Sequence, residues 1–144
     1  MGIIQMMSVA IVLTTLAALG VLLWASRNGL KLPMPYRERG CQGAGWRQAF
    51  PTASKEEIRS FLSLFVDAFA FKAADRLKFN PEERVLDVYR ALYPSKWAPD
   101  SLEVETLAKA LRKTYNIDLG AIWSNATTLG ELFSQAHSPS GRGA

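Results

Sequence analysis

Residues Ile3–Trp24 read IIQMMSVAIVLTTLAALGVLLW, a run of 22 residues without a charged side chain. At a rise of about 1.5 Å per residue, a helix of this length crosses the roughly 30 Å hydrocarbon core of a bilayer. Trp24 ends the run, where aromatic side chains are favoured at a membrane interface. The run therefore predicts an all-helical transmembrane anchor over residues 1–25.

A cleavable signal peptide is the alternative interpretation of this run. Signal peptides begin with basic residues and end in a small-residue cleavage site after a shorter apolar core. No Lys or Arg precedes the run, and no A-x-A pattern follows Leu22. These two departures favour an uncleaved anchor.

Basic residues follow the apolar run. Residues 25–47 carry five Lys or Arg and one acidic residue, Glu38. Because positively charged flanks remain on the cytoplasmic side, we expect a single-pass protein of the cell inner membrane with a cytoplasmic C-terminal domain. Such charges also attract anionic lipid, each by about 1 kcal/mol near the surface. The residues that we expect to contact anionic lipid are Arg27, Lys31, Arg37 and Arg39.

The net charge of +4 comes from this flank, because the residues from Gln48 onward include 12 basic and 12 acidic side chains. Basic charge beside a membrane span indicates lipid as the partner, and no nucleic acid is expected. The single cysteine, Cys41, excludes an intrachain disulfide and agrees with a reducing cytosol. Its thiol is either incidental or palmitoylated beside the membrane.

Residues 26–51 are predicted to form a basic flexible linker. Proline and glycine interrupt any helical or strand pattern there. The glycine-rich stretch 40–45 does not match a phosphate-binding loop, since no strand precedes it and no Lys-Ser or Lys-Thr follows.

Helical patterns begin at Ser54, which forms a capping box with Glu57. Apolar residues then recur at steps of three and four as far as Leu77, which predicts one long helix. A second helix is expected after Asn80 as its N-cap and Pro81 as its first residue, ending before Pro94.

A third helix is predicted to begin at Asp100 and Glu103, and a short final helix at Thr128 and Glu131. The apolar face of the third helix is Val104, Leu107, Ala108, Leu111 and Tyr115. Sustained two-residue alternation is absent, so the domain over residues 52–136 is predicted to be all-α, with a disordered tail over residues 137–144.

The residue types argue against an enzyme. The only histidine, His137, falls in the predicted tail, so no Ser–His or Cys–His pair is expected on a rigid scaffold. No Cys/His cluster suits a metal ion. The acidic pairs 56–57 and 82–83 stand at predicted helix starts, where they favour the helix dipole. No catalytic residue and no metal ligand are therefore expected.

Ser101 is the candidate site residue. At the start of the third helix its hydroxyl is expected to be exposed, beside unpaired N–H groups that favour a phosphodiester. The alternative is structural: Asp100 caps the helix with Glu103, and Ser101 is an ordinary first-turn residue.

The stretch Asp100–Leu119, DSLEVETLAKALRKTYNIDL, resembles the second helix of acyl and peptidyl carrier proteins, and the stretch 127–129 resembles the start of that family's last helix. The resemblance implies a four-helix bundle with 4′-phosphopantetheine attached to Ser101, and Asp100 and Leu102 as neighbours recognised by the attaching transferase. The chain departs from the family in two of its features. Residues 98–99 are Ala-Pro, whereas the family usually has glycine two residues before the Asp-Ser-Leu triplet. The matching helix carries basic side chains, whereas the family's second helix is strongly acidic.

Two functions follow as expectations. One is a membrane-tethered, acyl-carrier-like protein that presents a group to acyl-handling enzymes at the cytoplasmic membrane surface. The other is an unmodified, membrane-anchored helical module that binds a partner protein. The aromatic content favours the second, because aromatic side chains are enriched at interfaces. The residues concerned are Phe61, Phe65, Phe69, Phe71, Phe79, Tyr89, Tyr93, Trp97 and Trp123. For each of them taken singly we expect core packing, with some exposed at an interface; for Trp97, in a loop beside Ser101, both alternatives stay open.

Overall fold

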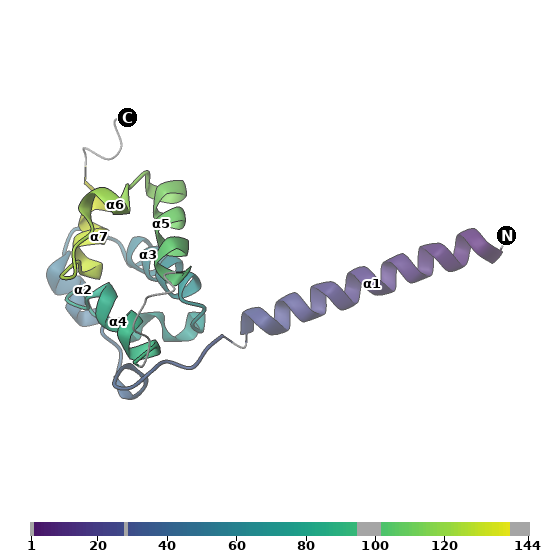
Figure 1. The fold of residues 1–144 in the computed structure, drawn as a ribbon, viewed down its shortest axis with the longest axis horizontal. Coiled ribbons are helices and arrows are strands. Elements are labelled where there is room, and N and C mark those ends of the chain that lie inside the picture. The colour runs from purple at the N-terminus through teal and green to yellow at the C-terminus, as the bar shows by residue number, and fades with distance from the viewer. Residues whose placement is uncertain (1, 28, 95–101, 139–144) are drawn as a thin grey trace.

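The computed structural model describes residues 2–27, 29–94 and 102–138, and only the backbone of residues 24–27. Every regular element in this part of the chain is a helix, which confirms the predicted all-α class (Figure 1). The α-helices are α1 (Gly2–Arg27), α2 (Gly43–Ala49), α3 (Lys55–Ala68), α4 (Val85–Leu92), α5 (Leu102–Tyr115), α6 (Leu119–Ile122) and α7 (Leu129–Ala136). Two 3₁₀ helices accompany them, η1 (Tyr36–Glu38) and η2 (Ala73–Lys78).

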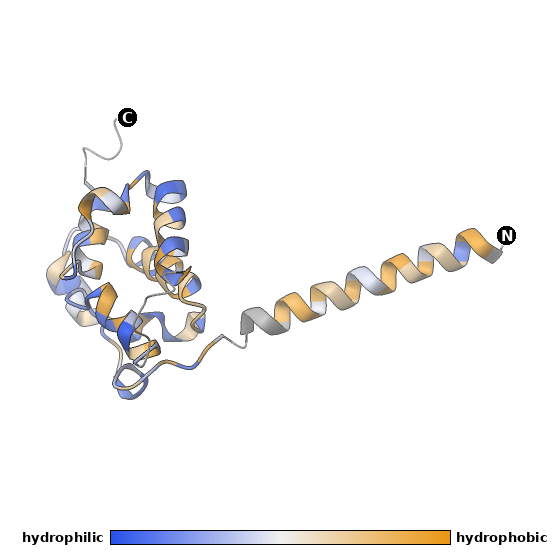
Figure 2. Ribbon diagram, in the orientation of Figure 1, coloured by the Kyte–Doolittle hydropathy of each residue, from blue (hydrophilic) through white to orange (hydrophobic). Residues whose placement is uncertain are grey.

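Helix α1 extends away from the helical body formed by the later elements (Figure 1). Its segment Gly2–Leu23 is long and apolar enough to span a membrane, and none of it is buried in the body. The hydroxyls of Ser8 and Thr14 donate to the carbonyls of Ile4 and Ala10, one turn earlier, at 2.9 and 3.0 Å. Because these donors are satisfied within the helix, α1 presents an almost uniformly apolar surface (Figure 2).

The core of the body is built largely from aromatic rings. The rings of Phe61 and Phe133 lie 5.4 Å apart, and those of Phe65 and Phe79 lie 5.1 Å apart, both in edge-to-face geometry. Such pairs add to the stabilisation from buried area. Core packing is confirmed for most of the aromatic residues named above: Phe61, Phe65, Phe69, Phe71, Phe79 and Tyr89 are buried. Trp97 lies outside the described residues, and Tyr93 and Trp123 are half-buried against the core.

Residues 29–51 of the predicted flexible linker pack against the body and bury three side chains in its core, so this stretch is not a flexible linker, although most of its side chains remain exposed. The buried side chains there are Leu32, Tyr36 and Trp46. We call residues 29–42 the strap. Its backbone is held by two hydrogen bonds of 2.7 Å, from the Leu30 N–H to the Ala70 carbonyl and from the Gln42 N–H to the Leu77 carbonyl. Proline and glycine rule out a long helix, but they do not prevent an irregular segment from burying its apolar side chains.

Gly29 stands where the strap first meets the body. A Cβ added there would lie 2.7 Å from the carbonyl carbon of Phe71. Only glycine permits this close approach of two backbones, which a β-bridge between Leu30 and Phe71 completes.

The long helix predicted from Ser54 to Leu77 ends early, at Ala68. The N–H of Phe71 donates to the Val66 carbonyl at 2.8 Å, and the N–H of Ala70 donates to the Asp67 carbonyl at 3.1 Å. These two bonds form a Schellman C-cap, with Ala70 at a left-handed φ of 58°. The apolar spacing continues past this turn because η2 also packs against the core through Leu77.

Ala70→Gly is expected to raise the free energy of unfolding. An L-residue other than glycine loses about 1–2 kcal/mol in the left-handed region, and glycine's greater unfolded-state freedom offsets part of the gain. The net gain is about 0.5–1 kcal/mol, measured by urea denaturation of the full chain in detergent micelles. Ala74→Gly, at an exposed position of η2, is the control and should give no gain. Equal changes in both variants would contradict the assignment.

The second predicted helix, from Pro81, begins only at Val85. The carbonyls of Pro81 and Glu83 accept hydrogen bonds from the N–H groups of Gly130 and Leu129, at 2.7 and 2.9 Å. Asn80 does not cap a helix; its side-chain oxygen accepts from the Glu82 N–H at 2.9 Å, closing a turn. The first four residues of the predicted helix are therefore used to dock the start of α7.

Two predicted helix starts are confirmed, and the predicted place of His137 is corrected. Ser54 with Glu57 and Thr128 with Glu131 each form the predicted capping box. His137, placed by the sequence in a disordered tail, instead ends α7. Its ring stacks on Phe133 at 4.1 Å. His137 is the C-cap of α7, and its backbone N–H donates to the Phe133 carbonyl at 3.1 Å.

Candidate functional site

The candidate site lies at the start of α5. This helix begins at Leu102, whose side chain is 64% exposed. Asp100 and Ser101 lie outside the described residues, so the structure places only their covalent neighbour. The start of α5 to which they are joined is open to solvent, as attachment of a group at Ser101 requires.

A hydrogen bond joins the two ends of the connection that contains Ser101. The Tyr93 hydroxyl, just after α4, donates to a carboxylate oxygen of Glu103 in the first turn of α5. This contact holds the first turn of α5 beside the end of α4, and the Glu103 carboxylate accepts the hydrogen bond from Tyr93 there.

Helix α5 is held in place by one apolar face. Leu107 and Leu111 are fully buried, and Val104, Ala108 and Tyr115 pack half-buried beside them, as the spacing predicts. Lys109, Arg112 and Lys113 are exposed. A protein that approaches Ser101 along α5 therefore meets a basic surface.

The described residues fit a phosphopantetheine arm in part. The first-turn N–H groups of α5 favour a phosphodiester at Ser101. Glu103 and Glu105 in the same turn oppose a further negative charge, although the exposure of Glu105 to water weakens this repulsion. The arm itself would extend into solvent from an exposed helix start.

A groove runs between α3, η2 and α5. It encloses about 810 Å³, with Leu64, Ala68 and Ala110 forming apolar parts of its walls. Arg59, Arg76 and Lys113 contribute positive charge; Glu56 and Asp67 contribute negative charge. The Nε of Arg76, on the η2 side of the groove, is buried and has no hydrogen-bond partner among the described residues. This N–H is therefore an unsatisfied donor.

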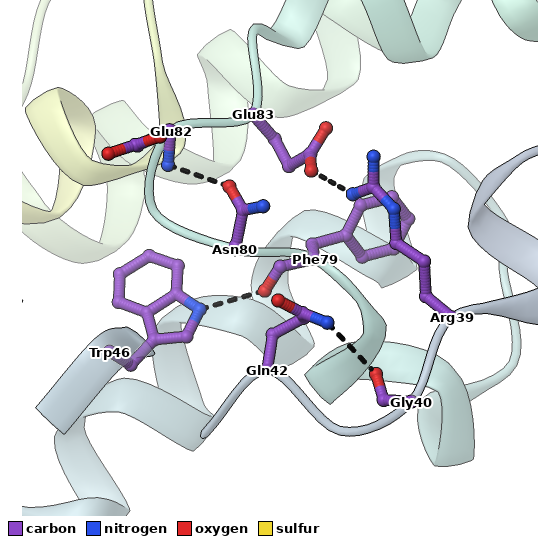
Figure 3. Close-up of polar contacts among 8 residues, drawn as sticks. All are labelled: Arg39, Gly40, Gln42, Trp46, Phe79, Asn80, Glu82 and Glu83. Carbon is purple, nitrogen blue, oxygen red and sulfur yellow. Dashed lines mark hydrogen bonds and ion pairs between the residues drawn. The ribbon is translucent and has the colours of Figure 1, made fainter. Parts of the chain in front are cut away.

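A polar cluster that the sequence did not predict joins the strap to the segment before α4 (Figure 3). Arg39 forms an ion pair with Glu83, which is only 8% exposed, and the Arg39 guanidinium lies over the Tyr36 ring at 4.8 Å. Trp46 Nε1 donates to the Phe79 carbonyl at 2.8 Å in the same region. The two charged partners are 44 residues apart, so no spacing rule could have paired them.

This cluster changes two assignments made from the sequence. Glu83 was expected to face a helix dipole, and instead it neutralises Arg39. Arg39 was expected to contact anionic lipid, but its charge is used inside the body. The cluster ties the strap to the segment before α4 and so stabilises the fold.

Tyr36 makes the cluster sensitive to high pH. Burial, reinforced by the Glu83 carboxylate, raises the pKa of Tyr36 to about 12 from its ordinary value of 10.0. The folded chain therefore holds the phenolic proton more tightly than the unfolded chain. This contribution to stability is complete below pH 10 and is lost as the pH rises from 10 to 12.

Unfolding by alkali is expected to begin above pH 10, with roughly 2 kcal/mol lost by pH 12. The measurement is circular dichroism together with absorbance of the ionised phenol. Tyr36→Phe should flatten this part of the pH profile. An unchanged profile in Tyr36→Phe would contradict the role of Tyr36.

Among the described residues, no group of three or more His, Cys, Asp or Glu side chains is placed to hold a metal ion. His137 Nδ1 lies 3.0 Å from the Phe133 carbonyl oxygen, and Cys41 is exposed as a free thiol. Comparisons with protein-family models, curated proteins and solved structures found no match to this chain.

Proposed function

We propose that this chain is a membrane-tethered carrier protein. In this proposal α1 anchors it in the inner membrane. The cytoplasmic body then presents an acyl-type group on 4′-phosphopantetheine attached to Ser101. Asp100 and Leu102 are the neighbours that a transferase would read. A carrier needs no catalytic residue of its own.

The observation that carries the proposal is the position of α5. Helix α5 begins at Leu102, the last residue of the Asp-Ser-Leu triplet, and this exposed first residue belongs to a helix that Leu107 and Leu111 anchor in the core. The resemblance to carrier proteins requires this placement. The order α5, α6, α7, with Thr128 capping α7, is also in keeping with that family's last three helices.

Tethering gives such a carrier a kinetic advantage. Confining carrier and enzyme to one membrane surface raises their effective concentration without new contacts. Enzymes that elongate or transfer lipid chains are the class of partner that gains most. The basic surface of α5 implies that such a partner offers an acidic face.

Intact mass of the full chain, coexpressed with a broad-specificity phosphopantetheinyl transferase and purified in detergent, tests the proposal. We expect the mass to increase by one phosphopantetheine group. Ser101→Ala should lose the increment completely, since no other hydroxyl occupies the attachment position. Ser60→Ala, on an exposed face of α3, should keep it. A full chain that remains unmodified, or a Ser101→Ala variant that is still modified, contradicts the proposal.

The groove between α3, η2 and α5 favours a second candidate, the unmodified interaction module. The groove is lined by apolar and charged side chains, and the Arg76 Nε there has no partner among the described residues. Such a surface suits a peptide segment with an acidic residue. A photo-cross-linking residue at Ser63, in the groove, should capture such a partner in cells, whereas the same residue at Gln135, on α7, should not. Equal capture at both positions would contradict a role for the groove.

A further inference from the structure

The distance between the anchor and the body is short. Helix α1 ends at Arg27, and the Leu30 N–H already donates to the Ala70 carbonyl. Three residues span at most about 10 Å when fully extended. If α1 spans the bilayer, the edge of the body at Leu30, Ala70 and Phe71 is therefore held at the membrane surface.

Two chain segments meet at this edge and carry an excess of positive charge. Residues 29–40 and 70–78 together contain six Lys or Arg and two Asp or Glu. Their surplus of four equals the net charge of the whole chain; the remaining residues contain 11 of each sign. The segments are joined side by side, because Lys78 Nζ also donates to the Arg37 carbonyl, at 2.9 Å.

The positions of the charges show which of them can meet lipid. Lys31 and Arg37 are exposed, and Lys72 is partly exposed. Asp75, one of the two acidic residues, lies 3.4 Å from Lys78 and is neutralised by it. Arg39 is partly exposed, but its charge is paired with Glu83.

Two large apolar side chains are exposed on the same strap. Leu30 is 52% exposed and Met34 is 51% exposed. Exposed apolar side chains among basic ones are typical of surfaces that lie in the lipid headgroup region, where the apolar groups enter the boundary of the acyl chains and the charges contact phosphate.

We propose that the body docks on the anionic membrane surface through this face, defined by Leu30, Lys31, Met34, Arg37 and Lys72. The inference rests on the proposed membrane anchor. It adds that the body has a fixed orientation on the lipid and is not a free domain on a flexible tether. The start of α5 is then presented at a constant height above the bilayer.

Spin-label accessibility on the full chain in vesicles tests the docking. In a Cys41→Ser background, a label at Met34→Cys is compared with a label at Gln135→Cys on α7. In vesicles of phosphatidylcholine and phosphatidylglycerol, we expect the label at 34 to be protected from a water-soluble relaxant and relaxed by oxygen. The label at 135 should remain in water.

The anchor is tested separately in the same samples, by resistance to alkaline carbonate extraction. Extraction of the chain would mean that the anchor has failed. A chain that resists extraction but whose label at 34 is as accessible to water as the label at 135 would overturn the docking alone.

Charge reversal distinguishes this face from general attraction. Lys31→Glu with Lys72→Glu should shift the docked-to-free ratio by more than about 30-fold, since about 30-fold follows from the loss of two basic residues near an anionic surface and the two new carboxylates add repulsion. Lys109→Glu with Arg112→Glu, on α5, makes the same change in net charge and should leave label 34 protected. Equal release by both pairs would overturn the proposal.

Discussion

A chain that begins at Gly29 is expected to fold, whereas a chain that begins at Gln48 is expected to be unfolded. The residues removed in the shorter chain include Leu32, Tyr36 and Trp46, all buried in the core. Each large core side chain contributes about 2–5 kcal/mol, and the total stability of a small domain is only about 5–15 kcal/mol. Losing all three removes most or all of the stability.

The measurement is thermal unfolding of the two truncated chains, followed by near-ultraviolet circular dichroism. The chain from Gly29 should show a cooperative transition, because no side chain of Gly2–Leu23 is buried in the body. The chain from Gln48 should show none. A cooperative transition in the shorter chain would mean that the strap and α2 are not part of the folding unit.

Trp46→Ala is expected to lower the free energy of unfolding by about 3–5 kcal/mol. The indole is completely buried between Phe50, Phe61 and Phe133. Its removal leaves a cavity in the centre of the aromatic core. It also leaves the Phe79 carbonyl without the donor that reaches it at 2.8 Å.

Trp46→Phe separates the two effects. It keeps an aromatic ring but removes the indole N–H, so the loss should be about 1–3 kcal/mol, the usual penalty for an unpaired buried acceptor. Arg47→Ala, exposed in the same helix, should change stability by less than about 0.5 kcal/mol. Urea denaturation gives all three values. Equal losses for Trp46→Phe and Trp46→Ala would assign the whole effect to the hydrogen bond.

The sequence predicted best where the signal is local. The capping boxes at Ser54 and Thr128 lie where predicted, because each depends on four consecutive residues. The buried face of α5 was also predicted from its spacing, as was the apolar α1. At the candidate site, the sequence alone identified Ser101, and the structure describes its neighbour Leu102.

Prediction failed where backbone groups bind distant partners. The helix ends in a turn at Ala70, although the apolar spacing in the sequence continues to Leu77. No residue type in this stretch predicts that turn, because alanine rarely adopts a left-handed φ. Helix α4 begins late because the carbonyls of Pro81 and Glu83 bind the start of α7. The capping residues near Asn80 predicted a helix from Pro81, because local capping rules do not consider hydrogen bonds to distant parts of the chain.

What the sequence by itself determined is the helical class, an N-terminal helix long and apolar enough to span a membrane, and most of the helical faces. These properties follow from periodicity and from the length of an uncharged run, which are summed over neighbouring residues. Only the tertiary structure decided that residues 29–51 pack against the body and that Arg39 pairs with Glu83. The physical reason is that burial and ion pairing depend on which residues meet in space, and an irregular segment rich in Pro and Gly carries no periodic signal of its partners.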